Sequence, residues 1–152
     1  MNKNTNTIDI LNAVWNNDIE TIKTYINNGG DVNAKNQYGD TALMWARDAE
    51  MTKLLLDAGA NVNAKNINGS TALKRAKNAK ITKLLLDAGA DVNATDDQGY
   101  TALMRALTVE HVKLLIDAGA DVNAKNNWGE TALMLARNTK IIQLLKSHGA
   151  VA

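Results

Sequence analysis

The sequence contains no cysteine, no proline and no phenylalanine, and only two histidines among its 152 residues. The absence of cysteine excludes disulfide bonds, cysteine-ligated zinc and thiol nucleophiles, and two histidines are too few for a multi-histidine metal site. With 17 Lys and Arg against 16 Asp and Glu, the net charge of +1 argues against a broadly basic nucleic-acid binder and against an acidic tail. We therefore expect no metal site.

Long apolar runs are also missing. No segment approaches the roughly 18 apolar residues that cross a bilayer, and no apolar stretch typical of a signal peptide follows the polar start MNKNTNT. The length suits one compact domain with its own core. We expect a soluble cytoplasmic protein that binds no membrane, with export as an effector left open.

The dominant feature of the chain is an internal repeat with a period of about 30 residues. The four most similar units begin at Asp40, Ser70, Tyr100 and Glu130, as in STALKRAKNAKITKLLLDAGADVNATD, and a divergent unit begins at Ile8. We predict a single domain, residues 1–152, with an N-terminal capping unit, three internal units and a C-terminal capping unit. Their ranges are 7–35, 36–65, 66–95, 96–125 and 126–152.

Each unit carries signals for helix starts and helix ends. A threonine precedes a short first helix, where its hydroxyl can accept hydrogen bonds from unpaired amides, and a glycine follows the second helix at a left-handed position. The threonines are Thr41, Thr71, Thr101 and Thr131, and these glycines are Gly29, Gly59, Gly89, Gly119 and Gly149. Four more glycines lie in turns, so almost none remains for a phosphate-binding loop, and we expect no cofactor.

A single unit cannot bury its apolar face, so the units must stack. Two leucines of each second helix then form continuous rows. The rows are Leu54, Leu84, Leu114, Leu144 and Leu55, Leu85, Leu115, Leu145. Thr24 and Lys146 place polar residues where internal units are apolar, which is typical of end units and indicates a complete domain.

The pattern G-x-T-A-L-x-x-A followed by K-L-L-L-D-A-G-A-D-V-N-A resembles the ankyrin repeat, from about Ile8 to Ala150. The resemblance implies an all-α fold, an ankyrin-like α-solenoid of stacked helix-turn-helix units joined by β-hairpin-like turns. The usual T-P-L-H is T-A-L-M or T-A-L-K here, and the period is shorter than the family's usual one of about 33 residues. The missing residues lie between the two helices and amount to nearly one turn. We therefore expect truncated first helices and a shallower groove, with full length kept only in the first unit.

No arrangement of residues indicates an enzyme. His111 takes a second-helix position where other units have methionine or isoleucine, so we expect it to fill the core edge. His148 lies near a helix C-terminus, and Asp96 and Asp97 lie in a turn, where aspartate is favoured locally. Both serines belong to the repeat pattern, which leaves no serine–histidine–acid arrangement.

A basic stretch without acids runs from Lys65 to Lys83. We interpret it as a solvated face, because folding disperses these residues over two helices and a turn and no aromatic residue is interleaved for nucleic-acid stacking. A site for an anionic ligand or nucleic acid formed by Lys74, Arg75 and Arg105 stays an alternative.

Positions that vary between units are candidates for partner binding, because the constant positions serve the stack. They lie at the hairpin tips and at the first-helix residue two after the constant leucine. Tyr, Trp and Arg often anchor interfaces, although these aromatics could instead cover the core edge or stack on a neighbouring hairpin. Trp15 and Tyr25 are assigned to packing of the first unit. The candidates are Tyr38, Asp40, Trp45, Asn68, Ser70, Arg75, Gln98, Tyr100, Arg105, Trp128 and Glu130. A further varying row, expected one turn along the first helix, is Asp48, Asn78, Thr108 and Asn138.

The resemblance implies a non-catalytic protein-interaction module, or scaffold, that binds a protein partner through its concave face and hairpin tips. Two alternatives stay open: the anion or nucleic-acid site described above, and a structural or self-associating array. We expect a monomer, and nucleic acid is the less favoured partner.

Overall fold

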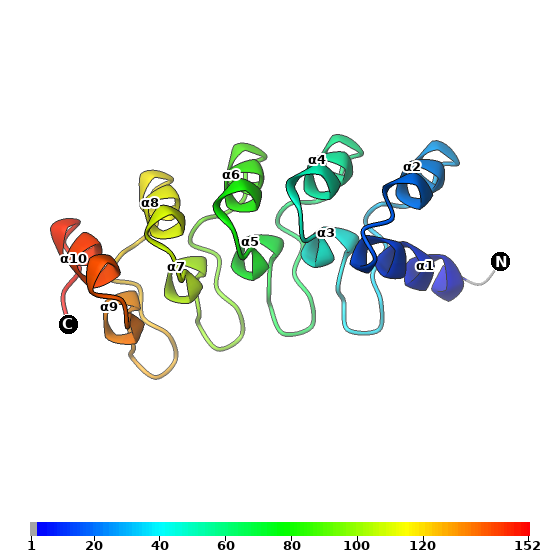
Figure 1. Ribbon diagram of the computed structural model, residues 1–152. Helices are drawn as coiled ribbons and strands as arrows, with labels where there is room; N and C mark the ends of the chain where they lie inside the picture. The colour runs from blue at the N-terminus through cyan, green and yellow to red at the C-terminus, as the bar shows by residue number, and fades with distance from the viewer. Residues whose placement is uncertain (1–2) are drawn as a thin grey trace.

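The computed structural model describes residues 3–152, with side chains from residue 9 onward, and contains ten helices there in five consecutive pairs (Figure 1). Residues 1 and 2 of the predicted domain lie outside the described residues. The helices are α1 (Lys3–Trp15), α2 (Ile19–Asn27), α3 (Ala42–Trp45), α4 (Ala49–Asp57), α5 (Ala72–Arg75), α6 (Ala79–Asp87), α7 (Ala102–Arg105), α8 (Val109–Asp117), α9 (Ala132–Leu135) and α10 (Thr139–Ser147). The first helix begins earlier than the predicted start of the first unit at residue 7.

The pairs stack side by side into a solenoid with two layers. The second helices α2, α4, α6, α8 and α10 form an outer layer, and the first helices form an inner layer from which the connecting hairpins project (Figure 1). The two ends of the chain lie at opposite ends of the stack. Residues 3–152 contain no strand, so the predicted all-α solenoid is confirmed. No helix in this range combines the length and apolar character needed to cross a membrane.

The inner helices of the last four units are very short, as predicted. They span four residues each, whereas α1 spans 13. The backbone is extended at Ala46, with φ −61° and ψ 131°, and at the equivalent alanines of the other units. This extended residue ends each inner helix after one turn. The expectation that Asp48 and Asn78 extend the first helix is therefore wrong. They are N-caps of the outer helices, and their side chains accept hydrogen bonds from the Met51 and Ile81 amides at 2.8 and 2.9 Å.

Three of the four predicted threonine caps on the inner helices are present. The hydroxyls of Thr71, Thr101 and Thr131 accept hydrogen bonds from the amide three residues later. Thr41 makes no such bond, and its Oγ1 is buried with no hydrogen-bond partner among the described residues. Thr41 is thus an exception to the prediction.

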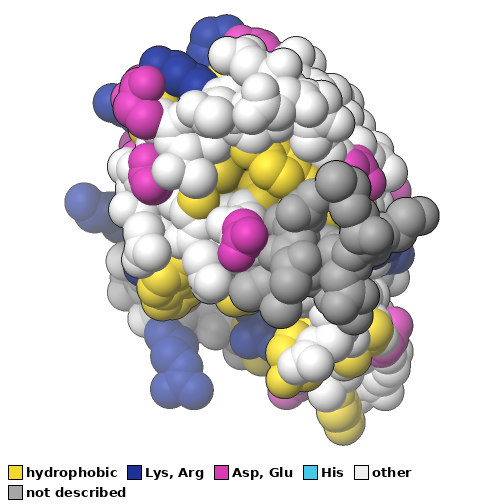
Figure 2. Space-filling model, turned by 90° about the vertical axis from the view of Figure 1, so that its right-hand side faces the viewer, with side chains coloured by type: hydrophobic (Ala, Val, Ile, Leu, Met, Phe, Trp, Pro, Cys, Tyr) yellow, Lys and Arg dark blue, Asp and Glu magenta, His cyan; other side chains and the backbone are white. Residues whose placement is uncertain are grey.

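The core runs through the whole stack. Leu55, Leu85, Leu115 and Leu145 are each at most 1% exposed, while the parallel row that begins with Leu54 is half-buried. His111 is buried, as an apolar position requires, and its Nε2 lies 2.8 Å from Thr82 Oγ1 on the neighbouring outer helix. At the first-unit end of the stack, apolar side chains are visible near the centre of the face and most Lys and Arg side chains at its margins (Figure 2).

The hairpins fix the register between units. The amide of Ile67 donates to the carbonyl of Tyr38 at 3.0 Å, and equivalent bonds join Asp97 to Asn68 and Asn127 to Gln98. Within each hairpin, one Asn or Asp side chain accepts two amide hydrogen bonds, as Asn66 does from Asn68 and Ser70. These repeated bonds hold the inner helices at constant spacing, so the side chains at their ends face one side of the stack.

Candidate binding groove

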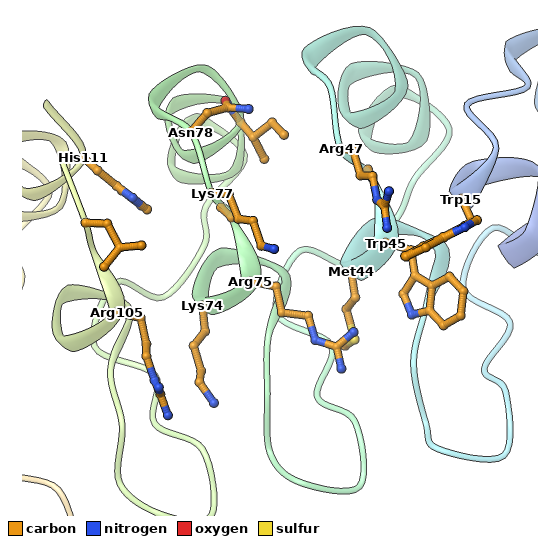
Figure 3. Close-up of a pocket in the computed structure, with 14 residues that line it drawn as sticks. Trp15, Met44, Trp45, Arg47, Lys74, Arg75, Lys77, Asn78, Arg105 and His111 are labelled. Carbon is orange, nitrogen blue, oxygen red and sulfur yellow. The ribbon is translucent and has the colours of Figure 1, made fainter.

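A groove with a volume of about 900 Å³ crosses the ends of four successive inner helices (Figure 3). The final residues of α1, α3, α5 and α7 all line it: Trp15, Trp45, Arg75 and Arg105. The connections that follow contribute Arg47, Lys77 and Leu107, and His111 contributes from the outer layer. We call this surface, with Met44 and Lys74, the inner-helix groove.

The structure brings together the row predicted from the first helices. Trp45, Arg75 and Arg105 all face the inner-helix groove (Figure 3). The fourth member, Leu135, is half-buried and does not line it. The groove therefore extends over the first four units.

Asp40 fixes the side chains of Trp45 and Arg75 at one end of the groove. Its carboxylate accepts hydrogen bonds from Trp45 Nε1 at 3.1 Å, Asn66 Nδ2 at 2.8 Å and an Arg75 guanidinium nitrogen at 3.0 Å. The Asp40 side chain is 8% exposed and that of Arg75 is 36% exposed. One buried carboxylate thus ties its own inner helix to the hairpin and inner helix of the next unit.

A second ion pair links the third unit to the fourth. Lys74 Nζ contacts Asp96 Oδ2 and also lies 3.1 Å from Ser70 Oγ. Burial by itself would raise the pKa of Asp96, but hydrogen bonds from Lys74 and from the Tyr100 and Gln98 amides, together with the Lys74 charge, hold it below its ordinary value. Asp96 is therefore a structural acceptor and not a free acid, in agreement with its turn position.

Two tryptophans and an arginine form a cluster at the α1 end of the groove. The rings of Trp15 and Trp45 meet edge to face with centroids 5.6 Å apart, and the guanidinium of Arg47 lies 3.3 Å from the Trp15 ring centroid. Trp15 is 52% exposed. It is therefore more than packing of the first unit, because it also lines the groove.

A matching cluster lies toward the other end. The Arg105 guanidinium is 4.1 Å from the Tyr100 ring centroid, and that ring packs against Trp128 of the next hairpin at 5.9 Å. Tyr100 is half-buried, while Tyr38 and Trp128 are exposed on their hairpins. The stacking alternative considered for these aromatics thus describes Tyr100 and Trp128.

Not every candidate is accessible. The expectation that Asp40 and Ser70 are exposed at the hairpin tips is wrong, since they are 6% and 8% exposed and accept hydrogen bonds from the next units or their own helix. Glu130 is half-buried and accepts a hydrogen bond from Asn126 at 2.8 Å. Asn68 and Gln98 are exposed. Asp40, Ser70 and Glu130 thus support neighbouring parts of the chain, whereas Asn68 and Gln98 stay accessible to a partner.

Sequence comparison between units overlooked Arg47, Lys77 and Leu107. These residues share one repeat position, which continues at Arg137. The sequence did carry a signal for this position, because Leu107 stands where the other units have arginine or lysine. Leu107 is 84% exposed, so no packing role explains it.

The sequence also matches a family model described as ankyrin repeats (3 copies), over residues 10–96 and again over residues 76–152. The chain belongs to the ankyrin repeat family. Ankyrin repeats are generally protein–protein interaction modules and typically carry no enzymatic activity. No curated protein matches the chain closely.

Proposed function

We propose that this ankyrin repeat protein is a non-catalytic binding module whose protein partner docks in the inner-helix groove and against the hairpin tips. The observation that carries the proposal is Leu107, which is 84% exposed inside a groove of about 900 Å³. Burying such a side chain against a partner contributes about 1.5–3 kcal/mol, and large exposed apolar groups in a hollow are typical of interaction sites.

The alternative anionic site made of Lys74, Arg75 and Arg105 has weaker support. Lys74 and Arg75 each contact a buried carboxylate of this chain, Asp96 and Asp40. An incoming phosphate would compete with an internal partner for two of the three cations. Docking of a protein in the groove requires no such exchange.

The test compares two variants that place aspartate at an exposed apolar position. Leu107→Asp changes the groove, and Val151→Asp changes a side chain that is 65% exposed outside it. Immobilised wild type and variants are incubated with native lysate, and the retained proteins are identified by mass spectrometry. We expect at least one retained protein to be lost with Leu107→Asp and kept with Val151→Asp. Identical retention by all three proteins would remove the groove from the proposal.

Three finer statements belong to the same proposal. The chain acts as one domain, as a monomer, and in the cytoplasm. A single cooperative urea transition would support one domain. A molar mass by light scattering that does not change with concentration would support a monomer. The location of a fluorescent fusion tests the cytoplasmic assignment. Mass that increases with concentration would favour the self-associating array.

A further inference from the structure

The charges of this chain are nearly balanced overall but unevenly distributed. Five basic side chains and no acidic one line the inner-helix groove: Arg47, Lys74, Arg75, Lys77 and Arg105. The acids of the outer helices, such as Glu50, Asp57, Glu110 and Asp117, lie in the other layer. The groove is therefore a local basic surface on a chain of net charge +1.

Three of these cations have no carboxylate partner among the described residues. Lys74 and Arg75 are neutralised from beneath, but Arg47, Lys77 and Arg105 are exposed and form no ion pair there. Two of the three are also oriented, because Arg47 stacks on Trp15 and Arg105 on Tyr100. A stacked guanidinium keeps its in-plane N–H donors available for bidentate hydrogen bonds to a carboxylate.

The same contacts favour a polypeptide over a nucleic acid. Binding of single strands relies on aromatic faces on which bases stack. Arg47 covers one face of Trp15 in the groove, and Arg105 covers one face of Tyr100 beside it. The accessible polar and apolar groups besides the exposed part of Trp15 are the guanidinium edges, the Lys77 ammonium and the Leu107 side chain, and these suit carboxylates and apolar side chains better than stacked bases.

We propose that the inner-helix groove binds an acidic polypeptide segment that carries a large apolar side chain. Carboxylates of the segment pair with Arg47, Lys77 and Arg105, and its apolar side chain packs on Leu107. This inference rests on the proposed function and specifies the chemistry of the partner at the same site. Electrostatic complementarity of this kind increases the association rate and selects the partner.

The test uses short fluorescein-labelled peptides and fluorescence anisotropy. One peptide is built from Glu-Glu-Leu triplets, a second replaces the acids with glutamine, and a third replaces leucine with glycine. We expect the first to bind at least about tenfold more tightly than either of the others, and to weaken as salt is added. Equal binding of the glutamine peptide would overturn the inference, as would no binding of the Glu-Glu-Leu peptide.

Two charge-reversed triple variants separate the groove from net charge. Arg47→Glu/Lys77→Glu/Arg105→Glu alters the groove, and Lys80→Glu/Lys113→Glu/Lys140→Glu makes the same change in net charge on exposed lysines of α6, α8 and α10. We expect the groove variant to lose at least about tenfold in affinity for the Glu-Glu-Leu peptide and the outer-layer variant to lose no more than about twofold to threefold. Equal losses would overturn the inference.

Two further results keep this inference distinct from the proposed function. An oligothymidylate that displaces the acidic peptide at a lower concentration than unlabelled peptide does would assign the groove to nucleic acid. The second result is a lysate protein that is lost with Leu107→Asp but retained equally by the wild type and the charge-reversed groove variant. That result would overturn the inference of an acidic partner and leave the proposed function standing. Far-UV circular dichroism confirms that each variant is folded.

Discussion

Lys74 and Asp96 form an ion pair at positions where the other repeats carry methionine and asparagine. Lys74 lies on α5 and Asp96 in the hairpin of the next unit, and their side chains are 15% and 6% exposed. The equivalent residues are Met44, Met104 and Met134 for Lys74, and Asn36, Asn66 and Asn126 for Asp96. The two departures from the repeat are thus one interaction, so changing both residues to the types found in the other units is expected to be tolerated better than changing either alone.

The size of each effect follows from the remaining partners. Breaking a fully buried pair costs about 3–5 kcal/mol. Without Lys74, Asp96 still accepts hydrogen bonds from the Gln98 and Tyr100 amides, and without Asp96, Lys74 still reaches Ser70 and some solvent. We therefore expect losses of about 1.5–3 kcal/mol for Lys74→Met and about 1–2 kcal/mol for Asp96→Asn. The double variant should lie within about 1 kcal/mol of the wild type.

Urea unfolding followed by tryptophan fluorescence gives the four free energies of this cycle. The expected coupling between the two substitutions, which is the sum of the two single losses minus the loss of the double variant, is at least about 1.5 kcal/mol. Losses that simply add in the double variant would refute the reasoning, since they would mean that the two residues do not stabilise each other. A loss for Lys74→Met as small as that of an ordinary surface substitution, below about 0.5 kcal/mol, would refute it as well.

The same pair predicts a response to acid. The folded pKa of Asp96 is below its unfolded value of 3.8. A group of this kind contributes stability that is complete above the unfolded pKa and is lost as the pH falls through the folded pKa. We expect the wild type to lose stability below about pH 4 more steeply than the Lys74→Met/Asp96→Asn variant, as measured by urea unfolding at decreasing pH.

Three further substitutions test other parts of the structure by urea unfolding. Asp40→Ala removes the acceptor of three hydrogen bonds and is expected to cost about 2–4 kcal/mol. Burial lowers the pKa of His111, so the unfolded chain binds the proton more readily than the folded chain does. The free energy of unfolding should therefore decline as the pH falls below about 6.5, by no more than about 1.4 kcal/mol per pH unit. His111→Ile should remove this decline. Gly30→Ala places a Cβ against the Tyr25 ring, closer than van der Waals contact allows, and should cost about 1–3 kcal/mol. Most of that loss should be recovered by adding Tyr25→Leu, because other units pair leucine with alanine at these two positions.

Each of these has a control or an outcome that contradicts it. Asp97→Ala removes an exposed carboxylate from a hairpin and should be nearly neutral, so an equal loss for Asp40→Ala and Asp97→Ala would contradict the role of Asp40. A pH dependence that persists in His111→Ile would assign it to another group. A Gly30→Ala protein as stable as the wild type would show that the Tyr25 ring moves aside freely.

Much of the fold was predictable because its signals are local. A cap residue, a glycine after a helix and a run of leucines act within one unit, and their regular recurrence along the chain predicts stacking. The truncated inner helices followed from the residues missing between the two helices. The Thr41 exception did not, because its three counterparts carry the same sequence signal and form the bond.

The candidate site was predictable in part. The row of Trp45, Arg75 and Arg105 follows from the 30-residue repeat, because equivalent positions of stacked units lie on the same side of the inner layer. Leu107 lies beyond the short inner helix, in a connection whose direction periodicity does not determine. Its exposure is visible only in the folded stack.

The amino-acid order alone determined the repeat, the all-helical solenoid and its family, and it showed no catalytic arrangement. Each of these depends on residue types at short, regular spacings. The stacking of one unit on the next decided which varying residues face a partner. It buried Asp40 beneath Arg75, paired Lys74 with Asp96, and left Arg47, Lys77 and Leu107 open. These contacts join different units, so they depend on how consecutive units are positioned and on the direction of each side chain, which no single repeat encodes.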